Sequence, residues 1–173
     1  ILTSATGFSR MKKSELYAKD VSSVQNILTA YYDCISGPIG EKRDFERLKN
    51  LFDPEARLIY SHWNKESTKA SNLIFKTLDE FIERMGYLDK KGFYEHEVSN
   101  QIHTFSSVTQ VFSTYKFRVE DKSIPEGQGI TSYEIFYDGD RAKLLLIGEV
   151  LLNDLKGVSA ISRFEATPEQ TLF

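Results

Sequence analysis

The chain has 173 residues, of which 40% are hydrophobic and 27% charged, and its formal net charge is −3. These values are typical of one globular domain, since a chain of roughly 150 residues already buries about 70% of its unfolded surface. The sequence has no basic cluster that would neutralise phosphates, which argues against a nucleic-acid partner. It also has no apolar run near the roughly 20 residues of a membrane span.

Cysteine and histidine usage limits the chemistry. Cys34 is the single cysteine, so an intrachain disulfide and a cysteine metal cluster are both excluded. His62, His96 and His103 follow no zinc spacing within one element, and we expect neither a metal nor another cofactor. The sequence begins at Ile1 and leaves the compartment open: cytoplasmic or, if a leader has been removed, periplasmic or secreted.

Two helices are predicted first. Asp20 is the expected N-cap of a helix whose apolar residues recur at helical spacing over 21–35. Gly37-Pro38 ends this helix, because proline cannot continue the hydrogen-bond ladder. Asp44 is the expected N-cap of a second helix, which Pro54 ends.

A strand and a third helix follow. Residues 56–63 alternate as a strand does, and the polar residues 64–72 are predicted to form a loop. Thr77 and Glu80 fit a capping box, in which each side chain bonds to a backbone donor of the other residue. Gly86 is the expected C-cap of this helix.

The second half of the chain changes to a period of two. Ser106-Ser107 and Asp138-Gly139-Asp140 are predicted turns of two hairpins. Strands longer than the common 5–6 residues usually bend at bulges, so we expect a strongly curved sheet. The predicted strands cover residues 93–105, 108–120, 129–137 and 142–153.

This order of elements resembles the nuclear transport factor two-like, or SnoaL-like, superfamily. The stretches ISGPIGEKRDFERLKNLFDPEARL, GFYEHEV, VFSTYKFR and GITSYEIFYDGDRAKLLLI are similar to uncharacterised bacterial members. The resemblance implies an α+β, cone-shaped, cystatin-like fold, with three N-terminal helices packed on a strongly curved antiparallel sheet. It covers about residues 20–153, which leaves residues 1–19 as an N-terminal arm and 154–173 as a C-terminal tail.

The resemblance also allows a comparison with the ketosteroid isomerases. Their catalytic base is a carboxylate on the strand after the second helix, assisted by a tyrosine and a protonated acid. Aligned by eye, Tyr60 occupies the position of the base, and the second acid position falls near Tyr133. The helix tyrosine would be Tyr31 or Tyr32. Isomerase chemistry of this type is therefore not expected, because the base is missing.

Glu149 is the most unusual residue, since it interrupts an aliphatic strand. Alternation places it beside Ile147, and the rough alignment places it on the inner face with Tyr133. A carboxyl among aliphatic groups has its pKa raised by desolvation and would serve as a general acid or base near neutral pH. The alternative is a structural glutamate at a strand end, solvated or paired with an arginine.

Two further candidates are His103, which would line the same cavity, and Trp63, which would stack on a flat ligand near its mouth. Their structural alternatives are a hydrogen-bonded rim histidine and a tryptophan packed over the core. Arg57, Glu95 and Glu97 would form an inner charge pair or a solvated sheet face. The candidate ligand-binding residues are Tyr31, Tyr60, Trp63, His103, Tyr133 and Glu149.

The last predicted strand also suggests a partner. A strand that is apolar on both faces is usually buried on both, and the helices cover only one face of the sheet. We therefore expect a homodimer through the outer sheet face. Its apolar residues are Leu144, Leu146, Val150 and Leu152 on that outer face, and Leu145, Ile147 and Leu151 on the inner face.

Three functions remain open at this point. The first is binding of a small apolar or aromatic molecule in the cone cavity. The second is a proton-transfer enzyme, such as an isomerase, dehydratase or cyclase, with Glu149 or His103 as the acid or base. The third is a non-catalytic dimeric interaction module whose cavity is filled by side chains.

Overall fold

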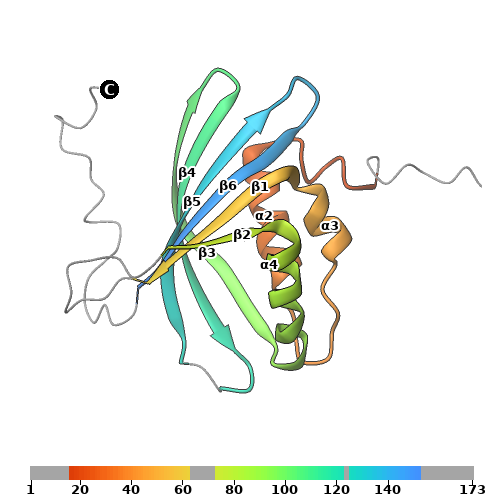
Figure 1. Ribbon diagram of the computed structural model, residues 1–173, viewed down its shortest axis with the longest axis vertical. Coiled ribbons are helices and arrows are strands. Elements are labelled where there is room, and N and C mark those ends of the chain that lie inside the picture. The colour runs from red at the N-terminus through yellow and green to blue at the C-terminus, as the bar shows by residue number, and fades with distance from the viewer. Residues whose placement is uncertain (1–15, 63–72, 123–124, 153–173) are drawn as a thin grey trace, which may run out of the picture.

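The computed structural model describes residues 16–62, 73–122 and 125–152. In this part of the chain, the helices lie on one side of a curved six-stranded sheet with the order β2-β1-β6-β5-β4-β3 (Figure 1). The elements are α2 (Val24–Ile35), α3 (Phe45–Asn50), β1 (Phe52–His62), β2 (Ile74–Thr77), α4 (Leu78–Met85), the 3-10 helix η1 (Gly86–Lys90), β3 (Phe93–Phe105), β4 (Val108–Val119), β5 (Gly127–Tyr137) and β6 (Ala142–Leu152).

The sheet is mixed, which corrects the prediction of a wholly antiparallel sheet behind three N-terminal helices. β1 pairs with β6 in parallel, and Tyr60 lies opposite Glu149 in this register. The other pairings are antiparallel. Two strands, β1 and β2, precede α4 in the chain. Local periodicity could not reveal the parallel pairing of β1 with β6, because the direction in which two distant strands pair is a tertiary property.

Of the two predicted N-caps of the first helices, Asp44 is confirmed and Asp20 is wrong. The N-cap of α2 is Ser23, whose side chain accepts a hydrogen bond from the backbone N–H of Asn26. Asp20 instead forms an ion pair with Arg47, with 2.7 Å between Oδ2 and Nε. Asp44 caps α3 as predicted and accepts from the backbone N–H of Arg47.

The region around β1 and α4 shows two confirmed signals and one correction. The capping box of Thr77 and Glu80 is confirmed at the start of α4. Gly86 is the C-cap of α4, as predicted, with a right-handed φ of −58°, and the chain continues directly into η1. Pro54 lies within β1, not at a helix end, beside the irregularity that separates Phe52 from Arg57 in the pairing with β6.

The four long strands and both predicted turns are confirmed. The turns contain Ser106 and Gly139, whose φ angles are 53° and 100°. The register shifts between Glu97 and Ser99 in β3, and again between Glu134 and Ile135 where β5 meets β6. Such irregularities increase strand twist and bend the sheet around the helices (Figure 1).

The bulge on β6 changes which residues face the core. Glu134 pairs with Leu146 and Ile135 with Leu144, so Leu145 is the extra residue. Leu144 is consequently fully buried together with Ile147. This corrects the prediction that Leu144 belongs to the outer face, since strict alternation does not survive a bulge.

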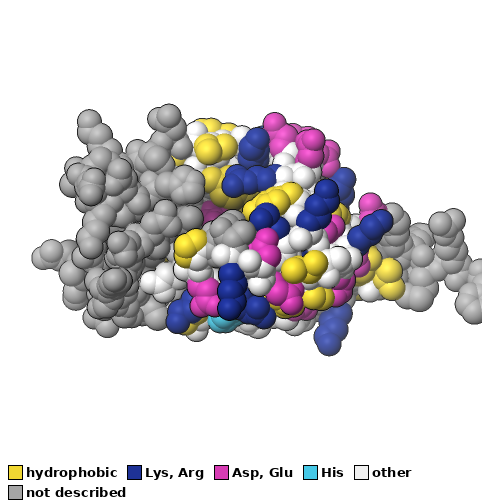
Figure 2. Space-filling view, turned by 90° about the horizontal axis from the view of Figure 1, so that it is seen from below, with side chains coloured by type: hydrophobic (Ala, Val, Ile, Leu, Met, Phe, Trp, Pro, Cys, Tyr) yellow, Lys and Arg dark blue, Asp and Glu magenta, His cyan; other side chains and the backbone are white. Residues whose placement is uncertain are grey.

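The surface carries both signs of charge. On the side shown in Figure 2, acidic and basic side chains are interspersed with hydrophobic ones over the described residues. No helix within the described ranges has the length and hydropathy required of a membrane span.

Candidate functional site

A cavity of about 220 Å³ lies between the helices and the inner face of the sheet. Its walls come from α2, β1, β2, α4, η1, β3 and β6, so distant parts of the chain meet there. Most of the lining is aromatic or aliphatic, and the charged residues among it are Glu95, Glu149 and Arg84. The geometry is therefore that of a small apolar site with a few polar groups.

One wall of the cavity is aromatic. Tyr60 on β1 stacks with Phe81 on α4, with 6.4 Å between ring centroids and 25° between planes. Arg84 lies one helical turn beyond Phe81, and its guanidinium carbon lies 5.7 Å from the centroid of the Tyr60 ring. Tyr31 of α2 also lines the cavity and makes an edge contact with the Tyr133 ring behind it.

Glu149 is fixed from behind by a tyrosine. The hydroxyl of Tyr115 donates to Oε1 of Glu149 at 2.6 Å. Tyr115 is fully buried, and Gly129 lies directly opposite it on β5. A side chain at position 129 would collide with the Tyr115 ring, so the glycine makes room for this hydrogen bond.

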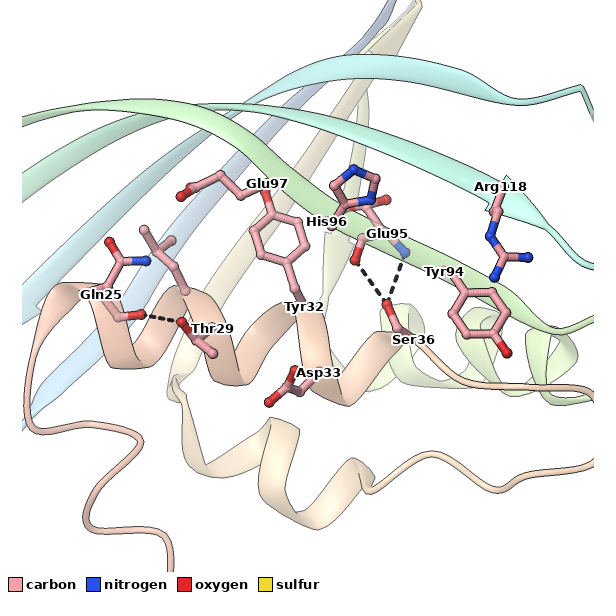
Figure 3. Close-up of a pocket in the computed structure, with 11 residues that line it drawn as sticks. Gln25, Thr29, Tyr32, Asp33, Ser36, Tyr94, Glu95, His96, Glu97 and Arg118 are labelled. Atoms are coloured by element: carbon pink, nitrogen blue, oxygen red, sulfur yellow. Dashed lines mark hydrogen bonds between the residues drawn. The ribbon is translucent and has the colours of Figure 1, made fainter.

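Glu95 is the second carboxyl of the cavity. Its backbone N–H and C=O both bond to the Ser36 hydroxyl at the end of α2, as the dashed lines in Figure 3 show. No hydrogen bond to its carboxyl is found within the described part of the chain. Burial and, secondly, the negative charge of Glu149 raise the pKa of Glu95 well above its ordinary value. Glu95 therefore holds a proton in a range where a solvated glutamate has lost it.

The tyrosines around this pair remain hydroxyl donors. Burial, followed by the charge of Glu149, raises the pKa of Tyr60 and of Tyr115. Burial also raises the pKa of Tyr31, with a smaller contribution from Tyr60. Neutral phenols therefore face the carboxyls throughout the physiological pH range.

A second, more open cleft of about 460 Å³ lies between α2 and the edge strand β3 (Figure 3). Several of its polar groups have partners within the protein. Glu97 accepts from Ser113 at 2.7 Å and from Asn100 at 2.7 Å. The Arg118 guanidinium carbon lies 3.9 Å from the centroid of the Tyr94 ring. Glu95 lines both this cleft and the inner cavity, and the inner cavity is the one that also contains Glu149 and the aromatic wall.

The structure brings three of the predicted residues into the inner cavity: Tyr31, Tyr60 and Glu149. It also separates the two helix tyrosines. Tyr31 faces the cavity, and Tyr32 lines the outer cleft, where its hydroxyl lies 2.9 Å from that of Ser113.

The remaining predicted residues lie elsewhere. Tyr133 is fully buried behind Tyr31 and donates to the Tyr32 hydroxyl, so it belongs to the core and does not line the cavity. His103 is exposed on the outer face of the sheet, because the bulge between Glu97 and Ser99 shifts the alternation of β3 and places His103 opposite Gln110. The far end of the β3–β4 hairpin also extends beyond the helices (Figure 1). Arg57 is half exposed and bonds to the carbonyl of Glu55, which corrects the inner charge pair with the β3 glutamates. Trp63 lies outside the described residues.

Two site residues had no convincing sequence signal. Glu95 was considered only as part of a charge pair, although its alternation with Phe93 on β3 places both side chains inward. Arg84 follows Phe81 by one helical turn, and this spacing predicts that both side chains lie on the same face of the helix. In the described residues, no group of three or more histidine, cysteine, aspartate or glutamate side chains is arranged to hold a metal ion.

No family model matches the sequence, and no curated protein matches it either. Several solved structures are similar. A protein of unknown function with a cystatin-like fold from Nostoc punctiforme has a TM-score of 0.55 at 11% identity, over 78% of this chain and 92% of that one. A candidate dehydratase of the NTF2-like family from Streptomyces avermitilis has a TM-score of 0.57 at 14% identity, over 79% and 99%.

A third similar structure is a candidate calcium/calmodulin-dependent kinase II association domain from Exiguobacterium sibiricum. Its TM-score is 0.57 at 12% identity, over 83% of this chain and 98% of that one. Similarity at such low identity establishes the fold and not the chemistry. The chain has a cystatin-like α+β fold with a curved mixed sheet, the fold of its NTF2-like structural neighbours.

Proposed function

We propose that this protein binds a small, largely apolar or aromatic molecule in the inner cavity. The observation that carries the proposal is the carboxyl of Glu95. It lines an aromatic cavity and has no hydrogen bond from the described chain. Glu95 is half-buried, and a polar group largely withdrawn from water without a partner is costly, so a ligand that supplies the missing bond gains affinity and orientation from it.

The size of the cavity limits the ligand. Drug-sized ligands occupy sites of roughly 300–1,000 Å³, and a dry cavity of about 150 Å³ accommodates benzene. At about 220 Å³, this cavity suits one ring with a short substituent. The stacked Tyr60 and Phe81 rings supply a flat wall for such a group.

Binding is testable with a set of single-ring compounds, followed by thermal shift and calorimetry. We expect some of them to raise the apparent stability by mass action. Ile74 lines the cavity and is 40% exposed. An Ile74→Trp variant should narrow the cavity and abolish these shifts. Phe75→Trp, one residue along β2 on the opposite face, is the matched control and should bind as the original protein does. Failure of every compound to bind the original protein would refute the proposal.

A second candidate function is proton transfer, and the Glu95–Glu149 pair favours it. A carboxyl that keeps its proton beside a second carboxyl supplies an acid and a base at one site. The similar structure described as a candidate dehydratase is compatible with such chemistry, although it shares only the fold. His103 is no longer a candidate, because it is exposed.

The distinguishing measurement is hydrogen exchange into a bound compound. A compound with an acidic C–H, incubated with the protein in deuterated water, should acquire deuterium faster than it does alone. Glu149→Gln should abolish the acceleration without abolishing binding. An unchanged exchange rate in that variant would remove Glu149 as the base.

We also propose that the protein forms a homodimer through the outer face of the sheet. Phe105, Val108 and Phe136 lie side by side across β3, β4 and β5. Phe105 is 86% exposed and Val108 is 37% exposed. Ile130 and Leu146, on the same outer face, are half-buried. A second copy of the chain would cover these apolar groups.

A further inference from the structure

We infer that the ligand of the inner cavity is an organic cation, a small aromatic amine whose ammonium group lies between Glu95 and Glu149. This inference rests on the proposed binding function and names the chemical class of the ligand. Its basis is the combination of two inward carboxyls with an aromatic wall in a cavity that fits one ring.

The first step concerns the carboxyls. Glu95 comes from the edge strand β3 and Glu149 from β6, and both side chains line the same cavity. Glu149 already accepts a short hydrogen bond from Tyr115, which fixes its position. Glu95 receives none from the described chain, so its oxygens are the acceptors that the fold leaves for a ligand. An ammonium group has three donors and no acceptor, and it matches this need.

The second step concerns the charges that face Glu95. The titratable groups around it are five tyrosines and one carboxyl: Tyr31 and Tyr32 from α2, Tyr60 from β1, Tyr115 from β4, Tyr133 from β5 and Glu149 from β6. The charge that acts on Glu95 is that of Glu149, which adds to burial in raising the pKa of Glu95. Arg84 lines the cavity from α4 but lies over the Tyr60 ring. A cation beside Glu95 would offset this repulsion, whereas an anionic ligand would add to it.

The third step concerns the walls. An ammonium or guanidinium group is attracted to the face of an aromatic ring within about 6 Å of its centroid. The Tyr60 ring already holds the guanidinium of Arg84 at 5.7 Å. Tyr31 and Phe93 line the same cavity, so an ammonium group near the carboxyls would also meet aromatic faces.

The test is calorimetric titration of the full chain with three compounds of equal size: benzylamine, benzyl alcohol and benzoate. We expect benzylamine to bind at least tenfold more tightly than benzyl alcohol, and benzoate to bind most weakly. Glu95→Gln should remove the preference for the amine, so that benzylamine and benzyl alcohol bind this variant with similar affinity. Glu134→Gln, which changes a glutamate on the outer face of β5, is the matched control and should keep the preference.

The pH dependence supplies an independent readout. Because the cation favours ionised Glu95, amine binding should release a proton, and the affinity should rise with pH from 5 towards 8. Titration in buffers of different ionisation enthalpy measures that proton directly. Benzyl alcohol should show neither effect, because it carries no charge.

Each other outcome has a defined meaning. Equal affinity for the amine and the alcohol would overturn the cation inference and leave the proposed binding function standing. Tight binding of calcium alone, with no amine binding, would overturn it in favour of a metal site. If none of the three compounds bound, the inference would fail; the fragment screen with the Ile74→Trp and Phe75→Trp variants would then decide separately whether the cavity binds anything.

Discussion

At the scale of single residues, Glu95 links the cavity to stability. Its folded pKa is raised above the ordinary value of 4.5, so the folded protein binds this proton more tightly than the unfolded chain does. The resulting contribution to the free energy of unfolding is fully present below about pH 4.5 and is lost as the pH rises through the folded pKa. Stability should therefore decline on the alkaline side because a buried carboxyl must ionise.

The prediction at this scale is that Glu95→Gln reduces the loss of folding stability as the pH rises. An amide is neutral at every pH, so the variant should be more stable than the original protein at pH 8 by at least about 1 kcal/mol, since one pKa unit corresponds to about 1.4 kcal/mol. The two proteins should unfold alike near pH 4. Urea unfolding over this pH range measures the difference, with Glu134→Gln as control. Parallel curves for Glu95→Gln and the original protein would show that Glu95 is not a strained carboxyl.

At the scale of elements, α4 carries Phe81, Arg84 and Met85 to the cavity and depends on its capping box. The backbone N–H of Glu80 donates to the Thr77 hydroxyl at 3.3 Å. The Glu80 carboxylate in turn accepts from the Thr77 N–H at 2.8 Å. The helix has eight residues and is too short to be stable by propensity alone. The cap therefore helps to hold Phe81 in place in the aromatic wall of the cavity.

We predict that Thr77→Ala lowers the free energy of unfolding by about 1 kcal/mol, the usual effect of losing an N-cap side chain. It should also weaken binding of any cavity ligand, because α4 positions Phe81 and Arg84. Thr77→Ser keeps the hydroxyl and should restore most of both properties. Urea unfolding and calorimetric titration measure the two effects, and an Ala variant as stable as the Ser variant would contradict the prediction.

At the scale of the whole molecule, the proposed homodimer interface on the outer sheet face predicts the oligomeric state. If the chain dimerises there, its sedimenting mass should approach twice 19.9 kDa at micromolar concentration. Ile130→Lys places a charge at the centre of this face and should produce a monomer. Ile102→Lys, on the inner side of β3 and 43% exposed, is the control and should remain dimeric. A monomer at all concentrations would exclude the interface.

The sequence predicted the elements well and their assembly less well. The four long strands, the Asp44 cap and the Thr77–Glu80 box were found because each depends on a few neighbouring residues. The parallel pairing of β1 with β6 and the bulge at Leu145 were missed, since both depend on residues far apart in the chain. The missed bulge explains the incorrect placement of Leu144.

The candidate site shows the same division. Alternation together with the family resemblance placed Glu149 inward, and the same resemblance narrowed the helix tyrosine to Tyr31 or Tyr32. Only packing assigned Tyr31 to the cavity and placed Tyr133 in the core. His103 was misplaced because the bulge between Glu97 and Ser99 reverses the alternation along β3, and His103 then lies opposite Gln110 on the outer face.

By itself, then, the sequence determined the α+β class, the long curved strands and the presence of an inward glutamate, because period, turn residues and caps act over short distances. The tertiary structure decided that Glu95 from β3 and Glu149 from β6 share one cavity. Their meeting depends on sheet curvature and on the docking of α2 and α4, which bring together residues more than fifty positions apart. Burial in this cavity, together with the charge of Glu149, raises the pKa of Glu95, and no local pattern contains that effect.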